Sequence, residues 1–277
     1  MASETPARRA DRYVVIGNPV AHSLSPTIQA RFAAQTGDAI EYATLLAPTD
    51  GFAQSVATFF ADGGRGANVT LPFKVEALRC ANDASDRAKR AGAANFLMMR
   101  EGRVLADNTD GAGLCADLRD NLGVTLRGAR ILLLGAGGAA RGVIAPLLEA
   151  GPETIVLANR TLARAREVAD HFPGLAACPL DAIEHAPFDL VLNATSTSTR
   201  GEALVLRAGL FAPGALAYDM AYGPAARAFR DQATALGAAR TTDGLGMLVE
   251  QAAESFFLWR GRRPRTAPVL AELRARA

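Results

Sequence analysis

Apolar and polar positions in the first part of the chain follow a pattern that predicts strands alternating with helices. Short β-branched or apolar runs alternate with stretches of helical spacing, and these segments cover residues 12–17, 26–37, 40–47, 50–64 and 66–70. Such alternation is typical of βαβ units, which build a mostly parallel sheet. Two further apolar runs, 96–100 and 103–107, flank Glu101-Gly102 and predict a β-hairpin.

A second alternating series begins at Ala129 and predicts a second sheet. Its segments, of which the second and fourth have helical spacing, cover residues 130–137, 138–151, 153–160, 161–172, 188–195 and 215–220. After residue 246, Leu248, Ala252, Phe256 and Trp259 are spaced to share one face of a last helix. We expect that helix to pack back on the first domain.

The length of 277 residues favours two domains, because it exceeds the usual size of a single-core domain. The expected fold class is α/β. It comprises a mostly parallel substrate-binding and catalytic domain at residues 1–112 and a Rossmann-type nucleotide-binding domain at 113–243. Residues 244–277 are expected to form a helical segment that returns to the first domain.

Composition narrows the class of function. The chain is 49% hydrophobic and 21% charged, has a net charge of +2, and contains no block of like charge, so neither nucleic acid nor a membrane is expected as a partner. No stretch reaches the roughly 18 apolar residues of a membrane helix, and the N-terminal apolar run is too short for a signal peptide. A cytoplasmic protein is expected. The cysteines and histidines lack ligand spacing, which predicts no metal.

A glycine-rich turn at residues 135–140, Gly-Ala-Gly-Gly-Ala-Ala, follows a predicted strand and opens a predicted helix. This is the context of a dinucleotide-binding turn, in which helix N–H groups donate to the pyrophosphate. The alternative is a glycine-rich turn that binds nothing. The candidate cofactor-binding residues here are Gly135, Ala136, Gly137, Gly138 and Ala139.

The end of the next predicted strand favours NADP over NAD. An NAD enzyme usually carries Asp or Glu about 20 residues after the glycine turn, where it binds the ribose 2′-hydroxyl. Here the chain reads Asn159-Arg160-Thr161, with Arg164 one helical step later. A guanidinium binds a 2′-phosphate that a carboxylate would repel. Alternatively, Thr161 caps the helix and Arg164 lies on a solvated face.

Lysine is rare in this chain, since only Lys74 and Lys89 occur among 30 cationic residues. A lysine can be tuned toward proton transfer and an arginine cannot, which makes Lys74 a catalytic candidate. It lies just after Pro72, the expected first residue of a helix whose positive end would favour the neutral amine. A surface lysine fits the position equally well. For Asp110, a helix N-cap is the simpler interpretation, and a proton-transfer pair with Lys74 is the alternative.

Five segments resemble the shikimate dehydrogenase family and occur in its order. They are GNPVAHSLSP at 17–26, GANVTLPFK at 66–74, GAANF at 92–96, ADNTDG at 106–111 and GAGGAAR at 135–141. DGLGMLVEQAAESF at 243–256 resembles the closing helix of that family, so the resemblance spans about residues 12–259. One departure is Gln29, where many members carry histidine.

The resemblance implies an NADP-dependent enzyme of aromatic amino-acid (chorismate) biosynthesis that reversibly reduces 3-dehydroshikimate to shikimate. Lys74 and Asp110 would be the catalytic pair. The implied substrate-binding residues are Ser23 and Ser25 at the carboxylate with Thr70 beside it, Asn68, Asn95, Lys74 and Asp110 at the ring hydroxyls, and Tyr222 and Gln251. The resemblance also implies Thr195 and Met220 as cofactor-binding residues. We add Gly244 as a further cofactor-binding candidate. Gly244 and Gly246 are also candidates for a hinge between the domains.

Four alternatives to these roles remain open at this stage. Ser25 as a simple N-cap and Gln251 as a structural glutamine fit the local pattern. A quinate/shikimate dehydrogenase of broader specificity fits the motifs, although Arg160 argues against its frequent use of NAD. A noncatalytic ligand sensor also fits, although it would not need both Lys74 and Asp110. The expected partner is a small molecule, and a homodimer is left open.

Overall fold

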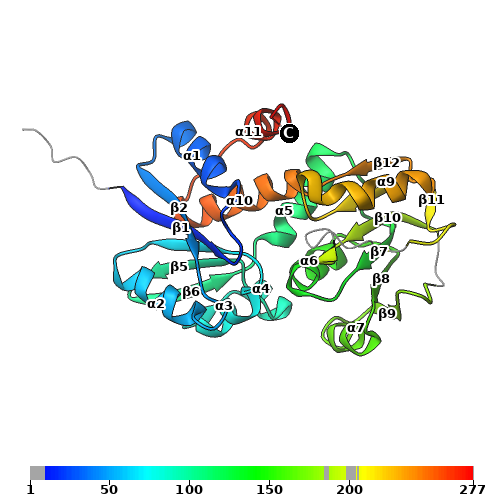
Figure 1. Cartoon of the computed structure of the whole chain (residues 1–277), viewed down its shortest axis with the longest axis horizontal. Coiled ribbons are helices and arrows are strands. Elements are labelled where there is room, and N and C mark those ends of the chain that lie inside the picture. Colours follow the sequence, from blue (N-terminus) through cyan, green and yellow to red (C-terminus); the bar gives the residue numbers. More distant parts are fainter. Residues whose placement is uncertain (1–9, 184–186, 198–203, 205, 277) are drawn as a thin grey trace, which may run out of the picture.

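The computed structural model describes residues 10–183, 187–197, 204 and 206–276, which form two α/β halves side by side (Figure 1). The strands of the first half are β1 (Asp11–Gly17), β2 (Ile40–Leu46), β3 (Gly66–Val69), β4 (Asp83–Ala84), β5 (Phe96–Arg100) and β6 (Arg103–Asp107). Its helices are α1 (Ser25–Thr36), α2 (Phe52–Ala61), α3 (Lys74–Cys80) and α4 (Asp86–Ala91).

The first sheet has the order β2-β1-β3-β5-β6-β4. Strand β1 pairs in parallel with β2 and β3, and β4 pairs in parallel with β6, whereas β5 is antiparallel to both of its neighbours. The predicted hairpin is confirmed between β5 and β6. Its two turn residues, Glu101 and Gly102, have φ of 53° and 74°, as a tight two-residue turn between twisted strands requires.

The second half is a doubly wound parallel sheet. Its strands are β7 (Arg130–Leu134), β8 (Thr154–Asn159), β9 (Leu175–Pro179), β10 (Phe188–Asn193), β11 (Phe211–Asp219) and β12 (Arg240–Thr242). Its helices are α6 (Gly138–Glu149), α7 (Leu162–Ala169) and α9 (Arg227–Ala235), with a 3-10 turn at Gly223–Ala226. The order β12-β11-β10-β7-β8-β9 is that of dinucleotide-binding domains, so the expected fold class is confirmed.

Central strand β7 illustrates why this sequence forms a buried parallel sheet. Its residues Ile131 to Leu134 are fully buried, because helices cover both faces of a parallel sheet and leave no side of the strand in water. The apolar run is therefore continuous rather than alternating. The strand ends at Leu134, three residues earlier than predicted, and the glycine turn lies beyond it.

The last long helix, α10 (Leu245–Arg260), packs on the first half as predicted. Phe256 meets Phe32 of α1 edge to face at 6.0 Å between ring centroids, and Trp259 stacks on Phe96 of β5 at 5.0 Å. A short helix, α11 (Ala267–Arg274), follows. Among the described residues, no helix combines the length and the apolar character needed to cross a membrane.

Helix α5 (Asp110–Ala116) lies between the two halves and continues into a π-helical turn at Asp117–Asn121. Two glycines allow its neighbours to approach closely. A Cβ atom on Gly111 would lie 2.6 Å from the carbonyl oxygen of Gly142 in α6, and one on Gly113 would lie 2.6 Å from the backbone nitrogen of Gln251 in α10. Both distances are shorter than any van der Waals contact, so only glycine fits.

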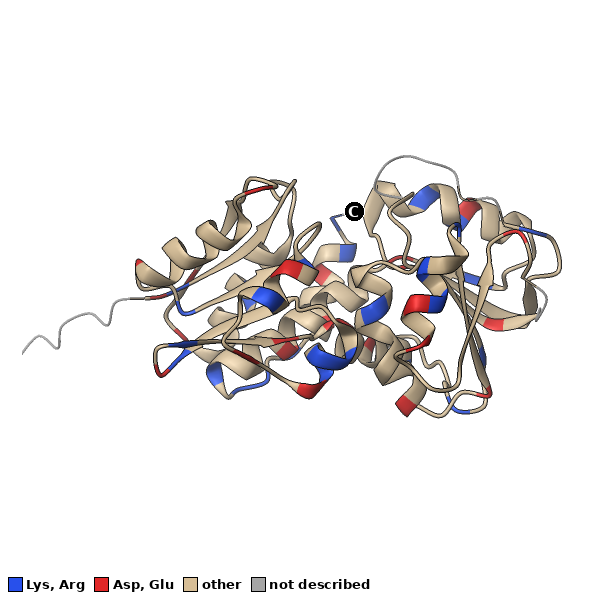
Figure 2. Cartoon of the chain, turned by 90° about the horizontal axis from the view of Figure 1, so that it is seen from below, with Lys and Arg blue, Asp and Glu red and all other residues tan. Residues whose placement is uncertain are grey.

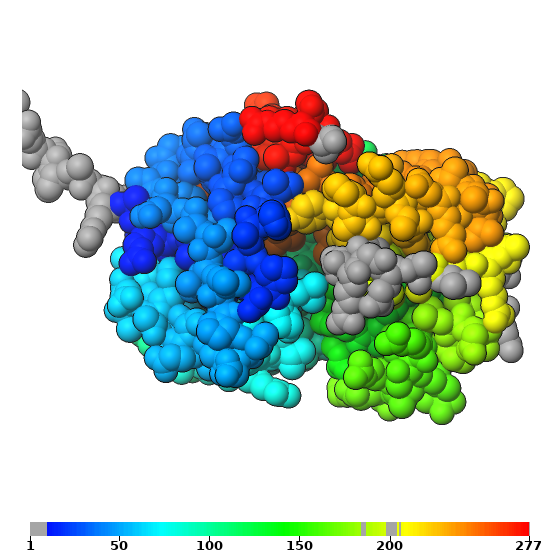
Figure 3. Space-filling model, in the orientation of Figure 1, coloured from blue at the N-terminus to red at the C-terminus, as the bar shows by residue number. Residues whose placement is uncertain are grey.

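Charged residues of both signs occur in both halves of the described part of the chain. Lys and Arg are interspersed with Asp and Glu over both halves (Figure 2), in agreement with the net charge of +2. The surface is hollowed where the two halves meet (Figure 3).

We predict that Gly113→Ala lowers the free energy of unfolding by about 1–3 kcal/mol, because the added methyl group meets backbone atoms of α10 that cannot rotate away. Thermal and chemical denaturation measure the effect. Ala112→Ser, at a half-buried position of the same helix, is the control, with a change within about 0.5 kcal/mol. A Gly113→Ala variant as stable as the wild type would show that α5 and α10 are farther apart than described.

Candidate active site

Lys74 and Asp110 form a close ion pair in the structure. The Nζ atom of Lys74 lies 2.6 Å from Oδ2 of Asp110, and the two side chains are 14% and 6% exposed. Each is the first residue of its helix, α3 and α5 respectively. The expectation that α3 begins at Pro72 is wrong by two residues, because the chain makes a turn in which the N–H of Phe73 donates to the carbonyl of Thr70.

The N-cap interpretation of Asp110 is also corrected. Thr109 is the N-cap, and Asp110 is the first helical residue, whose backbone N–H donates to Oδ1 of Asn108 at 3.1 Å. Its carboxylate is therefore free of the capping role. Oδ2 accepts a hydrogen bond from the Lys74 ammonium, and Oδ1 accepts one from Nδ2 of Asn95 at 2.8 Å.

Asn95 connects the loop before α5 to the start of β5, which begins at the next residue of the chain. Its Oδ1 accepts from the backbone N–H of Thr109 at 2.7 Å, and its Nδ2 also lies 2.9 Å from Oγ1 of Thr109. The amide of Asn95 thus fixes both the backbone and the side chain at the start of α5. A residue predicted only as a ligand contact also holds Asp110 in place.

Helix α10 contributes Gln251 and Ser255 to the same cluster. Oε1 of Gln251 lies 3.3 Å from Nδ2 of Asn95, and Oγ of Ser255 lies 3.2 Å from Oγ1 of Thr109. Ser255 also accepts from Nδ2 of Asn68 at 2.9 Å. We call this hydrogen-bonded set the polar network, and its members are Tyr42, Asn68, Lys74, Asn95, Thr109, Asp110, Gln251 and Ser255. Gln251 is 7% exposed, so the alternative of a half-exposed structural glutamine does not describe it.

The remaining substrate candidates lie around the start of α1. The backbone N–H of Ser25 donates to Oγ of Ser23 at 3.2 Å, and the N-cap is Leu24 rather than Ser25. Burial raises the pKa of the Tyr222 phenol, and a hydrogen bond with the backbone of Leu24 opposes that shift. Because Leu24 is the N-cap of α1, this bond brings Tyr222 of the second half to α1 of the first. The Cγ2 atom of Thr70 lies 2.4 Å from where a Cβ atom on Gly17 would be, so Thr70 packs against the end of β1.

The glycine turn adopts the geometry of a phosphate-binding turn. Gly135 has φ of 100°, which an L side chain rarely adopts, and Gly137 is the N-cap of α6. A Cβ atom on Gly137 would have no neighbour within 4 Å, which leaves space in front of the helix N-terminus. That terminus presents unpaired N–H groups and a positive dipole end to an anion.

The same helix brings the turn to the Lys74–Asp110 pair. A Cβ atom on Gly138 would lie 3.5 Å from Cβ of Lys74, and one on Gly142 would lie 3.2 Å from Oδ2 of Asp110. The turn that is suited to a dinucleotide therefore directly adjoins the ion pair.

The other candidates of the second half lie at the carboxyl ends of its strands. Oγ1 of Thr195 donates to Oδ1 of Asn193 at 2.7 Å, and the backbone N–H of Met220 donates to the carbonyl of Asn193 at 2.9 Å. Cβ atoms on Gly244 and Gly246 would lie 2.3 Å from the Met220 carbonyl oxygen and 1.9 Å from Oδ1 of Asp117. Close packing explains both glycines, and a hinge at these positions stays a prediction.

The candidates for a 2′-phosphate lie at the end of β8. Nδ2 of Asn159 donates to the carbonyl of Thr161 at 2.9 Å. Thr161 is the N-cap of α7, in agreement with the alternative that it caps this helix, but its side chain makes no capping hydrogen bond. Arg160 and Arg164 are exposed, and no ion pair is found for either within the described part of the chain.

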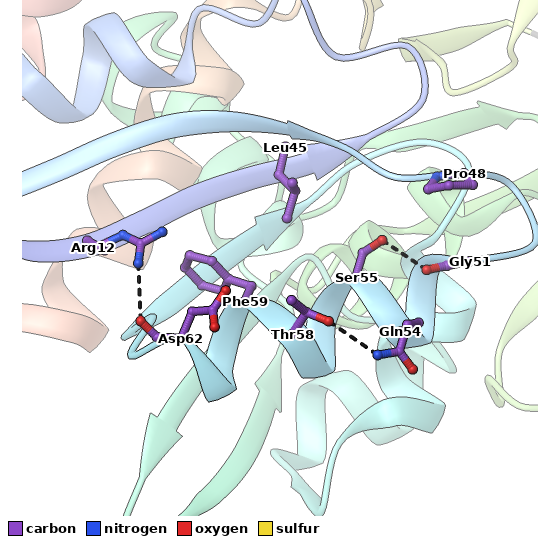
Figure 4. A pocket seen from close by; sticks show the side chains of 9 residues that line it. All are labelled: Arg12, Leu45, Pro48, Gly51, Gln54, Ser55, Thr58, Phe59 and Asp62. Carbon is purple, nitrogen blue, oxygen red and sulfur yellow. Dashed lines mark hydrogen bonds between the residues drawn. The ribbon is translucent and has the colours of Figure 1, made fainter.

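A surface pocket of about 420 Å³ lies elsewhere, between the edge strand β2 and α2 (Figure 4). Its polar groups bond to one another or to nearby backbone, as Arg12 does to the carbonyl of Asp62 and Gln54 to Thr58. None of its lining residues belongs to the polar network. This pocket is therefore separate from the Lys74–Asp110 pair and its hydrogen-bonded neighbours.

Comparison with known proteins agrees with this geometry. Residues 15–97 match the "Shikimate dehydrogenase substrate binding domain" family, residues 117–206 match "Shikimate / quinate 5-dehydrogenase", and residues 244–274 match "Shikimate 5'-dehydrogenase C-terminal domain". The shikimate dehydrogenase (NADP(+)) of Dechloromonas aromatica is 56% identical over 272 residues, which cover 96% of this chain and 98% of that protein.

This chain belongs to the shikimate dehydrogenase family.

Solved structures of the family have the same fold. The shikimate 5-dehydrogenase of Thermus thermophilus, in complex with NADP(H) and shikimate, is 34% identical with a TM-score of 0.82, covering 96% of this chain and 99% of that one. The ligand-free 5-ketofructose reductase of a Gluconobacter strain is 28% identical with a TM-score of 0.84, covering 98% and 100%. The fold therefore occurs with more than one substrate.

Tyr42, Thr109 and Ser255 belong to the polar network but were not among the residues expected from the sequence. Thr109 lies inside the family segment ADNTDG, and Ser255 follows Gln251 by one helical turn, so both carried a detectable signal. Tyr42 lies in an edge strand, 26 residues from its partner Asn68, and no local pattern indicates that contact.

We predict that Gly137→Ala weakens NADPH binding about tenfold or more while the midpoint of thermal unfolding stays that of the wild type. The methyl group meets no protein atom within 4 Å but fills the space before α6. Fluorescence titration with NADPH and thermal denaturation provide the two readouts. Unchanged affinity would exclude this space as the pyrophosphate site.

Proposed function

We propose that the protein is an NADP-dependent shikimate dehydrogenase, which catalyses the reversible reduction of 3-dehydroshikimate to shikimate. The observation that carries this proposal is the 2.6 Å contact between Lys74 and Asp110 beside the N-terminus of α6. The relative that is 56% identical and is named shikimate dehydrogenase (NADP(+)) supports it. So does the complex of the Thermus thermophilus enzyme with NADP(H) and shikimate.

The substrate would bind between α1, β3 and α10. The hydroxyls of Ser23 and Ser25, near the start of a helix, suit a carboxylate, and Thr70 would lie beside it. The amides and charged groups of the polar network suit ring hydroxyls, which both donate and accept. The proposed hydroxyl-binding residues are Asn68, Lys74, Asn95 and Asp110, with Tyr222 and Gln251 as further substrate contacts.

The residues present also fit NADP. An open N-terminus of α6 suits the pyrophosphate, and the exposed guanidiniums of Arg160 and Arg164 suit the 2′-phosphate. We propose the following cofactor contacts: Gly135, Ala136, Gly137, Gly138, Ala139, Asn159, Arg160, Thr161, Arg164, Thr195, Met220 and Gly244. When bound, the nicotinamide supplies a hydride for the carbonyl carbon of the substrate.

The protein's own part in the reaction is to move a proton. As the carbonyl oxygen becomes an alkoxide, the Lys74–Asp110 pair supplies the proton that neutralises it, and in the reverse direction the pair accepts the proton of the hydroxyl. Asp110 keeps the ammonium in place through the 2.6 Å contact, and Asn95 keeps Asp110 in place.

Two other functions are less well supported. A broader quinate/shikimate dehydrogenase that uses NAD would not need the exposed arginines at the end of β8. A ligand sensor needs to bind but not to transfer protons, so it would not require a buried lysine–aspartate pair. We further propose domain boundaries after residues 112 and 243, whereas a homodimer and a cytoplasmic location stay predictions.

We predict that Lys74→Ala lowers kcat for shikimate-dependent NADP⁺ reduction by roughly 100- to 10,000-fold, as is typical for loss of a general acid–base, with little change in KM. Absorbance of NADPH measures the rate. Lys89→Ala is the matched control, because Lys89 is the other lysine and its side chain is 57% exposed. If Lys74→Ala turned over at the wild-type rate, Lys74 would have no part in the reaction.

We predict that Arg160→Ala raises KM for NADP⁺ by about tenfold or more and leaves KM for NAD⁺ unchanged, because only NADP⁺ carries the 2′-phosphate that the guanidinium binds. Steady-state kinetics with both cofactors measures the ratio. Arg166→Ala, at an exposed position of the following helix α7, is the control. The same cofactor ratio in Arg160→Ala and wild type would contradict the assignment.

A further inference from the structure

Tyr42 lies in the polar network although no family segment in the sequence includes it. In the parallel pairing of β1 and β2 it is the register partner of Tyr13, and both rings pack against Trp259 of α10, with centroid distances of 4.7 Å for Tyr13 and 6.2 Å for Tyr42. The two hydroxyls have different partners. That of Tyr13 lies 3.3 Å from Arg260, whereas that of Tyr42 donates to Oδ1 of Asn68 at 2.8 Å.

The amide of Asn68 is held in one orientation by its neighbours. Its Nδ2 carries two hydrogens, and these have acceptors in the carbonyl of Asn95 at 3.2 Å and Oγ of Ser255 at 2.9 Å. A flipped amide would place its oxygen against the carbonyl oxygen of Asn95, which is repulsive. The hydrogens are therefore committed to protein acceptors. Oδ1, which accepts from Tyr42, keeps one further lone pair for a ligand.

The hydroxyl of Tyr42 also lies between two candidate substrate-binding residues. Burial raises the pKa of the Tyr42 phenol well above its ordinary value, and a hydrogen bond with the side chain of Ser25 opposes that shift. The residue as a whole is only partly buried, so the hydroxyl is the end that is removed from water. A phenol in this position remains a neutral donor at neutral pH. The hydroxyl donates to Asn68, which is proposed at a ring hydroxyl, and lies near Ser25, which is proposed at the carboxylate.

We propose that Tyr42 is a positioning residue of the substrate site: together with Ser255 it holds the Asn68 amide so that Oδ1 accepts a hydrogen bond from a substrate hydroxyl. This inference rests on the proposed function. Tyr42 acts through Asn68, to which its hydroxyl donates, whereas the Lys74 ammonium bonds Asp110. Its contribution therefore belongs to substrate binding and not to proton transfer.

A double-mutant cycle tests the proposal. KM and kcat for shikimate are measured at saturating NADP⁺ for the wild type, Tyr42→Phe, Asn68→Ala and the double variant. Tyr42→Phe keeps the ring that packs on Trp259, and we expect it to raise KM about tenfold with kcat within about twofold and an unchanged pH profile of kcat. In the Asn68→Ala background, the same substitution changes KM by less than about twofold, because the residue through which it acts is gone.

Tyr13→Phe is the matched control, since it removes a hydroxyl from the neighbouring strand beside the same tryptophan, and we expect KM to stay that of the wild type. Titration calorimetry with shikimate gives Kd for each variant independently of catalysis, and thermal denaturation identifies any variant that is not folded. The expected pattern in Kd is the same as in KM.

Three results overturn the inference. The first is a Tyr42→Phe variant with unchanged KM and Kd, and the second is an equal increase with and without Asn68. The third is a decrease in kcat with a shifted pH profile, which would place Tyr42 in proton transfer. A wild-type protein that does not reduce NADP⁺ with shikimate overturns the proposed function as well, so the two failures are distinguishable.

Discussion

The contact of α5 with α6 on one side and α10 on the other is the constraint on which the rest of the structure depends. Gly111 and Gly113 face these two neighbours, at distances that no side chain would permit. Asp110 is the first residue of α5, so the same contact places its carboxylate beside Gly142 of α6 and within reach of Asn95. Packing between helices thus determines where the Lys74–Asp110 pair lies.

The polar network explains how a charged pair can remain in a site that excludes most water. Removing two charges from water costs several kcal/mol per ion, and only good geometry with additional hydrogen bonds offsets that cost. Here one carboxylate oxygen of Asp110 has Lys74 and the other has Asn95, and Asn95 in turn holds Thr109. Stability and function therefore use the same bonds, since the groups that solvate the pair also suit the hydroxyls of a polyhydroxylated ring.

Much of the fold could be predicted from the sequence because its signals are local. The continuous apolar run of β7, the glycine turn before α6 and the Glu101-Gly102 hairpin each depend on a few adjacent residues. Short elements such as β4 and β12, with two and three residues, depend on pairing with neighbouring strands and carry no such pattern. The sequence pattern locates the start of α3 two residues too early and that of α5 one residue too late, because the turns before these helices are set by tertiary contacts.

The candidate site divides in the same way. Residues inside family segments, Lys74 and Asp110 among them, could be named in advance, but their 2.6 Å separation could not, since they are 36 positions apart in the chain. The contact of Asn68 with Ser255 joins positions 187 apart, and only folding brings them together.

A crystal structure of the protein with shikimate and NADP⁺ bound tests the central claim most directly. The account predicts that the hydroxyl on the reacting carbon lies within hydrogen-bonding distance of both Lys74 and Asp110, with the nicotinamide facing that carbon. A ring bound away from the pair, or with that carbon turned from the nicotinamide, would contradict it.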